Sequence, residues 1–125
     1  MLKKARRLAR AEFECLIAHG RRFRGTAVTL IALPSPKPYF RFGVSVGKKV
    51  AKTSVVRHAL RRSVYDMLAD HLTASHVPCD VAALVAPGAA HVSRHALRAD
   101  IEELAHRLEV SIEPHNHHRN SVRSY

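Results

Sequence analysis

The sequence predicts a single α/β domain, an α+β sandwich in which helices pack on one small central sheet. Three segments carry apolar residues at spacings of three and four, which is typical of helices, and three other segments are short and β-rich. The chain has 125 residues, of which 46% are hydrophobic, enough for one core of ordinary size and not comfortably for two. The predicted element order is α-β-β-α-β-α, with the helices covering the sheet.

Three helices are expected from apolar lines combined with capping or terminating residues. The first spans residues 9–18 and is followed by Gly20, the second runs from a cap at Thr53 or Ser54 to residue 72, and the third runs from a cap at Ser93 to residue 108. The core lines of the three helices are Phe13, Leu16 and Ile17; Val56, Leu60, Val64, Met67 and Leu68; and Leu97, Ile101, Leu104 and Leu108.

Three strands are expected over residues 26–33, 39–46 and 79–86, each bounded by prolines or glycines. The second strand alternates strictly, with one face for the core and one face that carries a charge and small residues. No repeat or linker divides the chain, so we expect one domain over residues 1–110 and a polar, flexible tail over residues 111–125. The core face comprises Phe40, Phe42, Val44 and Val46, and the opposite face comprises Arg41, Gly43 and Ser45.

Positive charge is concentrated in the first half of the chain. The sequence holds 21 Lys and Arg against 10 Asp and Glu, and no acidic residue occurs between Cys15 and Tyr65. A run of one sign and this length destabilises a domain by self-repulsion unless a polyanion neutralises it. We therefore expect an anionic partner, bound through the first half. The basic residues of this run are Arg21, Arg22, Arg24, Lys37, Arg41, Lys48, Lys49, Lys52, Arg57, Arg61 and Arg62.

Several other classes of protein are disfavoured. No apolar run approaches the ~20 residues of a membrane span, and the basic N-terminus runs into Glu12 without an apolar signal core. We therefore expect a cytoplasmic protein with no membrane association, in which Cys15 and Cys79 are reduced. The basic half offers no carboxylate cluster for a catalytic ion, so we expect neither a catalytic residue nor a metal site in this chain.

RNA binding is the function that these patterns favour. Residues 41–52 place a strand, a turn of small residues and three lysines before a helix that carries more cations. Cations on a helix and on the loop leading into it suit a structured phosphate backbone, because each neutralised phosphate releases counterions. The candidate RNA-binding residues are Lys48, Lys49, Lys52, Arg57, His58, Arg61 and Arg62.

Together these motifs resemble the protein subunit of bacterial ribonuclease P. Residues 10–20 are similar to the family's opening helix, residues 41–50 to its central strand and basic turn, and residues 80–90 to its third strand and following turn. Residues 56–62 resemble the signature helix, usually written Arg-Asn-Arg-x-Lys-Arg. His58 stands where the family has Asn, Ala59 replaces the second Arg, Arg61 replaces Lys, and Ile17 replaces a second aromatic residue of the opening helix.

The resemblance implies an accessory subunit of an endoribonuclease in which a large RNA is the catalyst. That RNA removes the 5′ leader of precursor tRNA with Mg²⁺ held mainly by the RNA, so the expected partners are the catalytic RNA and precursor tRNA, with no obligatory protein partner. The resemblance also implies a left-handed βαβ crossover, against the usual rule.

Two surfaces follow from the resemblance. The signature helix and its turn face the catalytic RNA, and a cleft between the first helix and the sheet holds the single-stranded leader. This cleft carries few aromatic side chains, so we expect weak base preference and reliance on phosphate contacts. The leader-binding residues are expected to be Phe13, Ile17, Arg41 and Ser45.

Three alternatives remain open on the sequence alone. A ribosomal or other structural RNA-binding protein suits a basic α/β domain equally well and predicts association with ribosomal particles. A DNA-binding module predicts a preference for duplex DNA, with the basic helix in the major groove. An independent nuclease requires a carboxylate cluster near the basic surface, which the sequence lacks.

Overall fold

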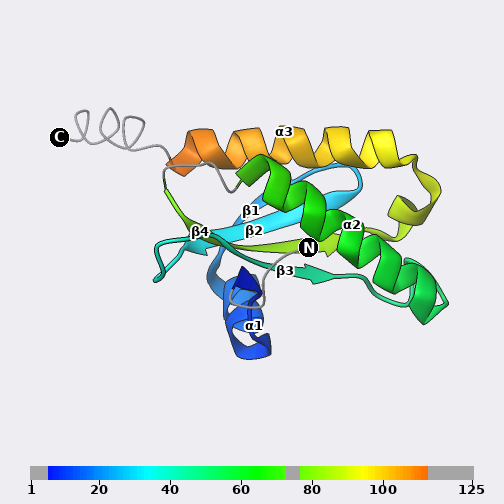
Figure 1. The fold of residues 1–125 in the computed structure, drawn as a ribbon, viewed down its shortest axis with the longest axis horizontal. Coiled ribbons are helices and arrows are strands. Elements are labelled where there is room, and N and C mark those ends of the chain that lie inside the picture. Colours follow the sequence, from blue (N-terminus) through cyan, green and yellow to red (C-terminus); the bar gives the residue numbers. More distant parts are fainter. Residues whose placement is uncertain (1–5, 73–76, 113–125) are drawn as a thin grey trace.

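The protein is described by a computed structural model that covers residues 6–72 and 77–112 (Figure 1). One mixed sheet of four strands, in the order β1-β2-β4-β3, carries α1 on one face and α2 and α3 on the other. The predicted single-domain α+β sandwich is therefore confirmed. The elements are α1 (Arg10–His19), β1 (Arg21–Arg24), β2 (Val28–Pro34), β3 (Arg41–Ser45), α2 (Ser54–Leu72), β4 (Cys79–Val85), the 3₁₀ helix η2 (Pro87–His91) and α3 (Arg94–Ile112).

The crossover between β3 and β4 is left-handed. These two strands are parallel neighbours, whereas β2 runs antiparallel to both β1 and β4. In Figure 1, α2 passes in front of the sheet, and β4 lies to the left of β3 when both strands are turned to point upward. This hand is rare for parallel β-α-β units, and the resemblance to the family, rather than the residue pattern, had implied it.

The core consists of two apolar layers, one on each face of the sheet. The larger layer lies between the sheet and the α2–α3 pair, where the Phe40 and Phe42 rings stack with centroids 5.9 Å apart. The smaller layer lies under α1 and centres on Leu16, Ile31 and Ala82. The strict alternation predicted for β3 is confirmed, because its aromatic and branched residues enter the larger layer while its alternate residues face α1.

The predicted caps of the two long helices are confirmed. The Thr53 hydroxyl accepts a hydrogen bond from the Val56 N–H at 3.3 Å, and the Ser93 hydroxyl accepts one from the Ala96 N–H at 3.0 Å. The last helix continues four residues beyond its predicted end, to Ile112. The first two residues of the expected tail are therefore helical, and the remainder of the tail, residues 113–125, lies outside the described residues.

Two details differ from the expectations. The short strand β1 was not predicted, because its sequence Arg-Arg-Phe-Arg has a single apolar residue and no recognisable alternation. It forms because its backbone pairs with β2, from Arg21 opposite Ala32 to Arg24 opposite Thr29. Val56 was expected in the core line of α2 but is 48% exposed, since it lies in the first turn of the helix and the buried residues of α2 begin only at Val64.

Candidate nucleic-acid interface

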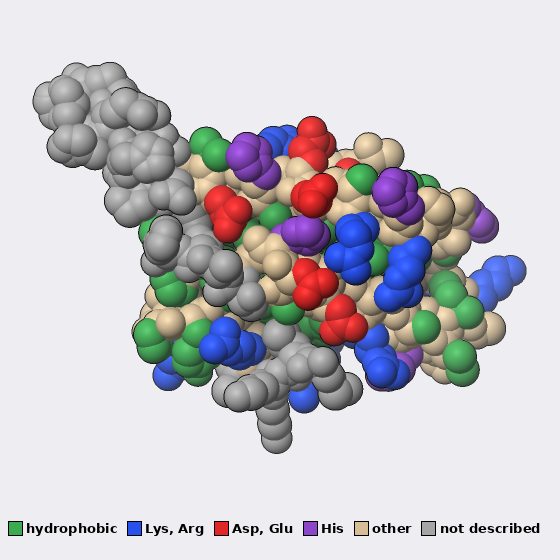
Figure 2. Space-filling view, turned by 45° about the horizontal axis from the view of Figure 1, so that its top comes forward, with side chains coloured by type: hydrophobic (Ala, Val, Ile, Leu, Met, Phe, Trp, Pro, Cys, Tyr) green, Lys and Arg blue, Asp and Glu red, His purple; other side chains and the backbone are tan. Residues whose placement is uncertain are grey.

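The candidate RNA-binding residues lie on the turn before α2 and on the first three turns of that helix. Five of the seven side chains are exposed, and those of Arg57 and Arg61 are partly buried. On the face that carries α2 and α3, Figure 2 shows blue side chains gathered toward the right, where α2 begins. The five exposed residues are Lys48, Lys49, Lys52, His58 and Arg62.

The partly buried side chain of Arg57 forms hydrogen bonds with the backbone of the basic turn. One of its terminal guanidinium nitrogens donates to the carbonyl oxygens of Ala51 at 2.9 Å and of Lys52 at 2.8 Å. The turn is fixed at its other end by Val50, whose side chain is buried and whose N–H bonds to the Gly47 carbonyl at 3.0 Å. Arg57 therefore orders the backbone that carries the three lysines, a role beyond its charge.

The N-terminal segment extends the basic surface to the open edge of the sheet. Arg7 forms a parallel bridge with Phe42 of β3, and the Leu8 N–H bonds to the Phe42 carbonyl at 2.9 Å. Burial raises the pKa of Tyr65 on α2, while a backbone hydrogen bond at Val44 and the charges of Arg7 and Arg61 act in the opposite direction. Arg7 and Arg61 are thus close to the same phenol, although nothing in the sequence places residue 7 beside α2.

Acidic side chains bound this basic surface. Asp66 and Asp70 follow on α2, and Asp70 pairs with Arg98 of α3 at 3.4 Å. Figure 2 shows red side chains near the middle of the same face, next to the blue group. The positive surface is therefore confined to the N-terminal half of α2, its turn and the neighbouring edge of β3.

On the opposite face, α1 lies directly on the sheet. An added Cβ at Gly43 would be 2.5 Å from Cδ1 of Phe13, so the phenyl ring rests on the β3 backbone. Ile17 is partly buried and packs with the smaller apolar layer, and Ser45 is exposed at the end of β3. All four expected leader-binding residues therefore lie on α1 or on the face of β3 that carries α1.

Arg41 lies on the face of β3 that carries α1, as expected, but its side chain is already paired. Its side chain is 9% exposed and donates to both oxygens of Asp80, at 2.9 and 2.8 Å, and to Glu12 at 2.7 Å. These hydrogen bonds raise the pKa of the guanidinium above its ordinary value, Asp80 most strongly. Two carboxylates, from α1 and β4, therefore neutralise Arg41, and its contact with the leader stays a prediction.

The strand register identifies surface residues that the sequence reasoning missed. Arg24 is opposite Thr29, Thr29 is opposite Leu84, and Leu84 is opposite Ser45, so these four residues form one row across the four strands. Gly43, on which Phe13 lies, belongs to the next row on the same face. This row beside α1, here called the open row, carries an exposed arginine and two hydroxyls, and only the register could have revealed it.

The described residues offer no obvious ion-binding cluster of their own. Within residues 6–72 and 77–112, no three or more His, Cys, Asp or Glu side chains come together as a group that could hold a metal ion. Both cysteines are unpaired, with Cys15 exposed and Cys79 buried. None of the helices in these described parts is both long and apolar enough to cross a membrane.

The fold and the charge distribution define a class of small, strongly basic α+β domains built on a left-handed β-α-β unit. The family described as "Ribonuclease P" matches residues 1–109, and the chain belongs to this protein family. The ribonuclease P protein component of Microcystis aeruginosa is 28% identical over 99 residues, which cover 76% of this chain and 82% of the relative. The corresponding protein of Picosynechococcus is 38% identical over 53 residues, 42% of this chain and 46% of the relative, so this match spans less than half of its length.

Solved structures agree on the fold. The RNase P protein of Staphylococcus aureus superposes with a TM-score of 0.74 at 19% identity, covering 87% of this chain and 97% of the other. The RNase P protein of Thermotoga maritima gives a TM-score of 0.71 at 18% identity, covering 81% and 96%. The expected family is therefore confirmed by a match to nearly the whole domain.

Proposed function

We propose that this chain is the RNA-binding protein subunit of a cytoplasmic ribonuclease P, which binds the catalytic RNA and assists removal of the 5′ leader from precursor tRNA. The observation that carries the proposal is the basic turn and helix, in which the two hydrogen bonds of Arg57 order the backbone that presents three lysines. Membership in the family supports the same role.

The catalytic RNA would bind the positive surface at the start of α2. Because the backbone that carries these exposed ammonium groups is already ordered, binding of phosphates costs little further backbone entropy there. His58 and Arg62 lie on the outer face of the helix, and Arg7 and Arg61 extend the surface toward β3. The acidic side chains beyond Asp66 set the limit of this surface.

The 5′ leader would bind on the opposite face, along α1 and the open row. Phe13 and Ile17 provide apolar contacts on the helix side, and Ser45 and Thr29 provide hydroxyls on the strand side. Since Arg41 is neutralised by Glu12 and Asp80, the exposed Arg24 is the cation of this row. A single-stranded leader is bound by such a combination of apolar contacts and backbone cations.

The catalytic RNA, and not this chain, would carry out the cleavage reaction. Mg²⁺ prefers several carboxylate or phosphate oxygens, and the two carboxylates nearest the cleft, Glu12 and Asp80, are engaged by Arg41. We therefore assign no catalytic residue and no metal ligand to this chain. The protein would act by binding and orienting the substrate, and the RNA would hold the ion.

Cleavage of a precursor tRNA at low Mg²⁺ tests the proposal. The reaction is run with the ribonuclease P RNA of the same organism alone, with the protein alone, and with both. We expect 5′ cleavage to be stimulated only when both are present. Mature tRNA, which lacks the leader, should compete poorly with the precursor for the complex. Tight RNA binding without stimulation would favour a structural RNA-binding protein, and cleavage by the protein alone would contradict the proposal.

A further inference from the structure

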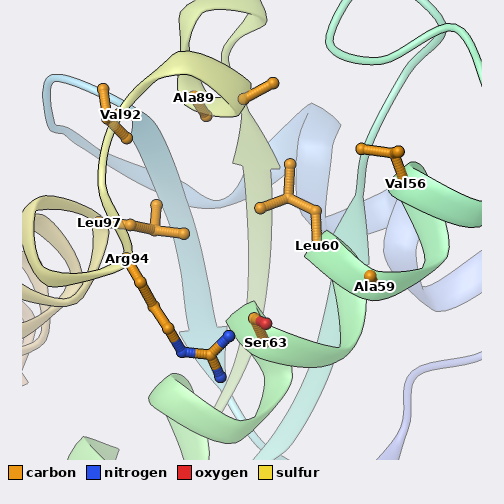
Figure 3. A pocket seen from close by; sticks show the side chains of 9 residues that line it. Val56, Ala59, Leu60, Ser63, Ala89, Val92, Arg94 and Leu97 are labelled. Carbon is orange, nitrogen blue, oxygen red and sulfur yellow. The ribbon is translucent and has the colours of Figure 1, made fainter.

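We propose that a hollow between α2, η2 and α3 binds one unpaired base of the RNA, an inference that rests on the proposed function. The hollow has a volume of about 240 Å³ and is open to solvent. In Figure 3, Leu60 of α2 and Leu97 of α3 point into it from opposite sides, and Ala89 of η2 closes one end. The hollow adjoins the first turns of α2, which also carry the candidate RNA-binding residues, but it is distinct from the leader-binding face.

The walls of the hollow are apolar and partly open to water. Among the described residues, only four large hydrophobic side chains are more than a third exposed, and two of them, Val56 at 48% and Val92 at 38%, line this hollow. Single exposed apolar side chains are ordinary, but these two line one concave surface, where a group with an apolar face would cover both of them. The occupant therefore has an apolar surface of its own.

The size of the hollow limits the occupant to one ring system. Pockets for drug-sized ligands run from about 300 to 1,000 Å³, so a hollow of about 240 Å³ fits a smaller group. A nucleobase is planar, presents apolar faces and carries its hydrogen-bonding groups at the edge. Ser63, on the α2 wall, offers a hydroxyl that can bond to such an edge.

The charge around the hollow favours an RNA base over an apolar side chain of a protein. Arg94 is the one charged residue that lines it, and in Figure 3 its side chain extends along the wall toward Ser63. A guanidinium can stack on a base and bond to the adjoining phosphate. Arg62 is exposed on α2 one residue before the lining residue Ser63, and Asp66 follows it one turn later.

Both long helices begin at this hollow, which adds a second electrostatic contribution. Val56 lies in the first turn of α2, and Arg94 is the first residue of α3. The N-terminal turns of both helices therefore contribute to opposite walls of the hollow, and the positive ends of their dipoles favour phosphates next to a bound base. Sequence-specific recognition of RNA commonly uses bases that are unstacked in loops and bulges, which is the form that this hollow accepts.

Filling the hollow without removing charge is the direct test. Ala59→Phe fills it from α2 and Ala90→Leu fills it from η2, and both alanines are exposed lining residues. We expect each variant to raise the Kd for the ribonuclease P RNA about tenfold, with the salt dependence unchanged. The matched control is Ala99→Phe, an exposed helical alanine in a neighbouring hollow that shares Val92 with this one and is bordered by Asp100 and Glu103.

A charge variant provides an independent measurement. Arg94→Gln is expected to weaken RNA binding and to reduce its salt dependence, whereas Arg98→Gln, four residues later on α3, changes neither. Chemical probing of the RNA should show one unpaired nucleotide that the wild-type protein protects and that neither filled variant protects. This nucleotide identifies the bound base.

Three results would overturn the inference. The first is wild-type RNA affinity in both filled variants. The second is protection of the same nucleotides by wild-type and filled proteins. The third is self-association of the free protein that the filled variants abolish, which would make the hollow a contact between copies. Failure of the wild-type protein to bind the RNA would instead contradict the proposed function itself, so the two failures can be distinguished.

Discussion

Arg41 and Asp80 form a two-bonded ion pair between adjacent parallel strands. The Nε of Arg41 donates to one carboxylate oxygen at 2.9 Å, and a terminal nitrogen donates to the other at 2.8 Å. The two residues are direct partners in the β3–β4 register, and the pair is largely buried. Glu12 joins it from α1, so one guanidinium connects the helix that would border the leader to the edge strand β3 and to its neighbour β4.

Removal of Asp80 should destabilise the protein far more than removal of a surface carboxylate. Asp80→Ala leaves a buried guanidinium with only the partly exposed Glu12, and we expect a loss of about 3 kcal/mol in the free energy of unfolding. Glu14→Ala, on the same helix as Glu12, breaks an exposed pair with Arg10 and should change stability by less than about 0.5 kcal/mol. Urea denaturation of both variants measures the difference, and equal effects would contradict the role of the buried pair.

Low pH should weaken the network of Arg41, Asp80 and Glu12, because Glu12 becomes protonated. Hydrogen bonds from the Ala9 backbone and from Arg41 lower the pKa of Glu12 below its ordinary value of 4.5. A carboxyl with a lowered pKa stabilises the fold fully above its unfolded value, and this stabilisation is lost as the pH falls through the folded value. Glu12→Gln should therefore destabilise the protein at pH 7 and make little difference at the lowest pH at which it still folds. Urea denaturation over this pH range tests it, and an equal difference at every pH would refute it.

Among the contacts that connect α3 to the β1–β2 turn, the hydrogen bonds of Asp100 should contribute most to the free energy of unfolding. The Asp100 carboxylate accepts hydrogen bonds from three successive backbone N–H groups, of Thr26 at 2.9 Å, Ala27 at 2.9 Å and Val28 at 3.1 Å. Asp100→Ala leaves these donors without their charged acceptor, and we expect a loss of about 2–3 kcal/mol. Glu103→Ala, an exposed neighbour on the same helix, serves as the control in thermal or urea unfolding. A small effect of Asp100→Ala would show that water replaces the carboxylate.

The sequence was sufficient for elements whose signals are local. Thr53 and Ser93 mark the starts of the two long helices, and the alternation around Phe42 assigns the two faces of β3. Each of these features depends on residues within a few positions of one another, so spacing alone determines them. The basic turn and helix were found in the same way.

Features that depend on register or on distant segments could not be predicted. β1 exists because β2 pairs with it, since its own residues, apart from Phe23, are arginines. The pairing of Arg41 could not be predicted, because nothing in the sequence places Asp80 opposite it. The open row and the position of Arg7 beside β3 likewise follow from strand pairing, which joins residues far apart in the chain.

A substitution at Gly43 should impair the proposed leader site without affecting the proposed surface for the catalytic RNA. Gly43→Ala places a methyl group 2.5 Å from the Phe13 ring, so α1 must move away from β3, and we expect a loss of about 1–3 kcal/mol in stability. The reconstituted complex should then bind precursor tRNA about tenfold more weakly, while the affinity for the catalytic RNA is unchanged. Gly47→Ala is the control, because nothing lies within 4 Å of an added methyl there. Unchanged precursor binding in a folded Gly43→Ala protein would remove Phe13 from the leader site.

Arg57 and Arg62 should differ in whether lysine can replace them. Arg57 is partly buried and donates to two carbonyls of the basic turn, whereas Arg62 is exposed on the outer face of α2. We expect Arg57→Ala and Arg57→Lys each to weaken RNA binding about tenfold, or about 1.4 kcal/mol, because an ammonium group does not reproduce the planar guanidinium.

Arg62→Ala should instead reduce the slope of log Kd against log salt by about one, and Arg62→Lys should restore it, because only charge is required there. Filter binding to the ribonuclease P RNA over a range of NaCl concentrations measures both quantities for all four variants. If Arg57→Lys binds as tightly as wild type, Arg57 acts as a charge alone. The hydrogen bonds to Ala51 and Lys52 would then contribute nothing to the interface.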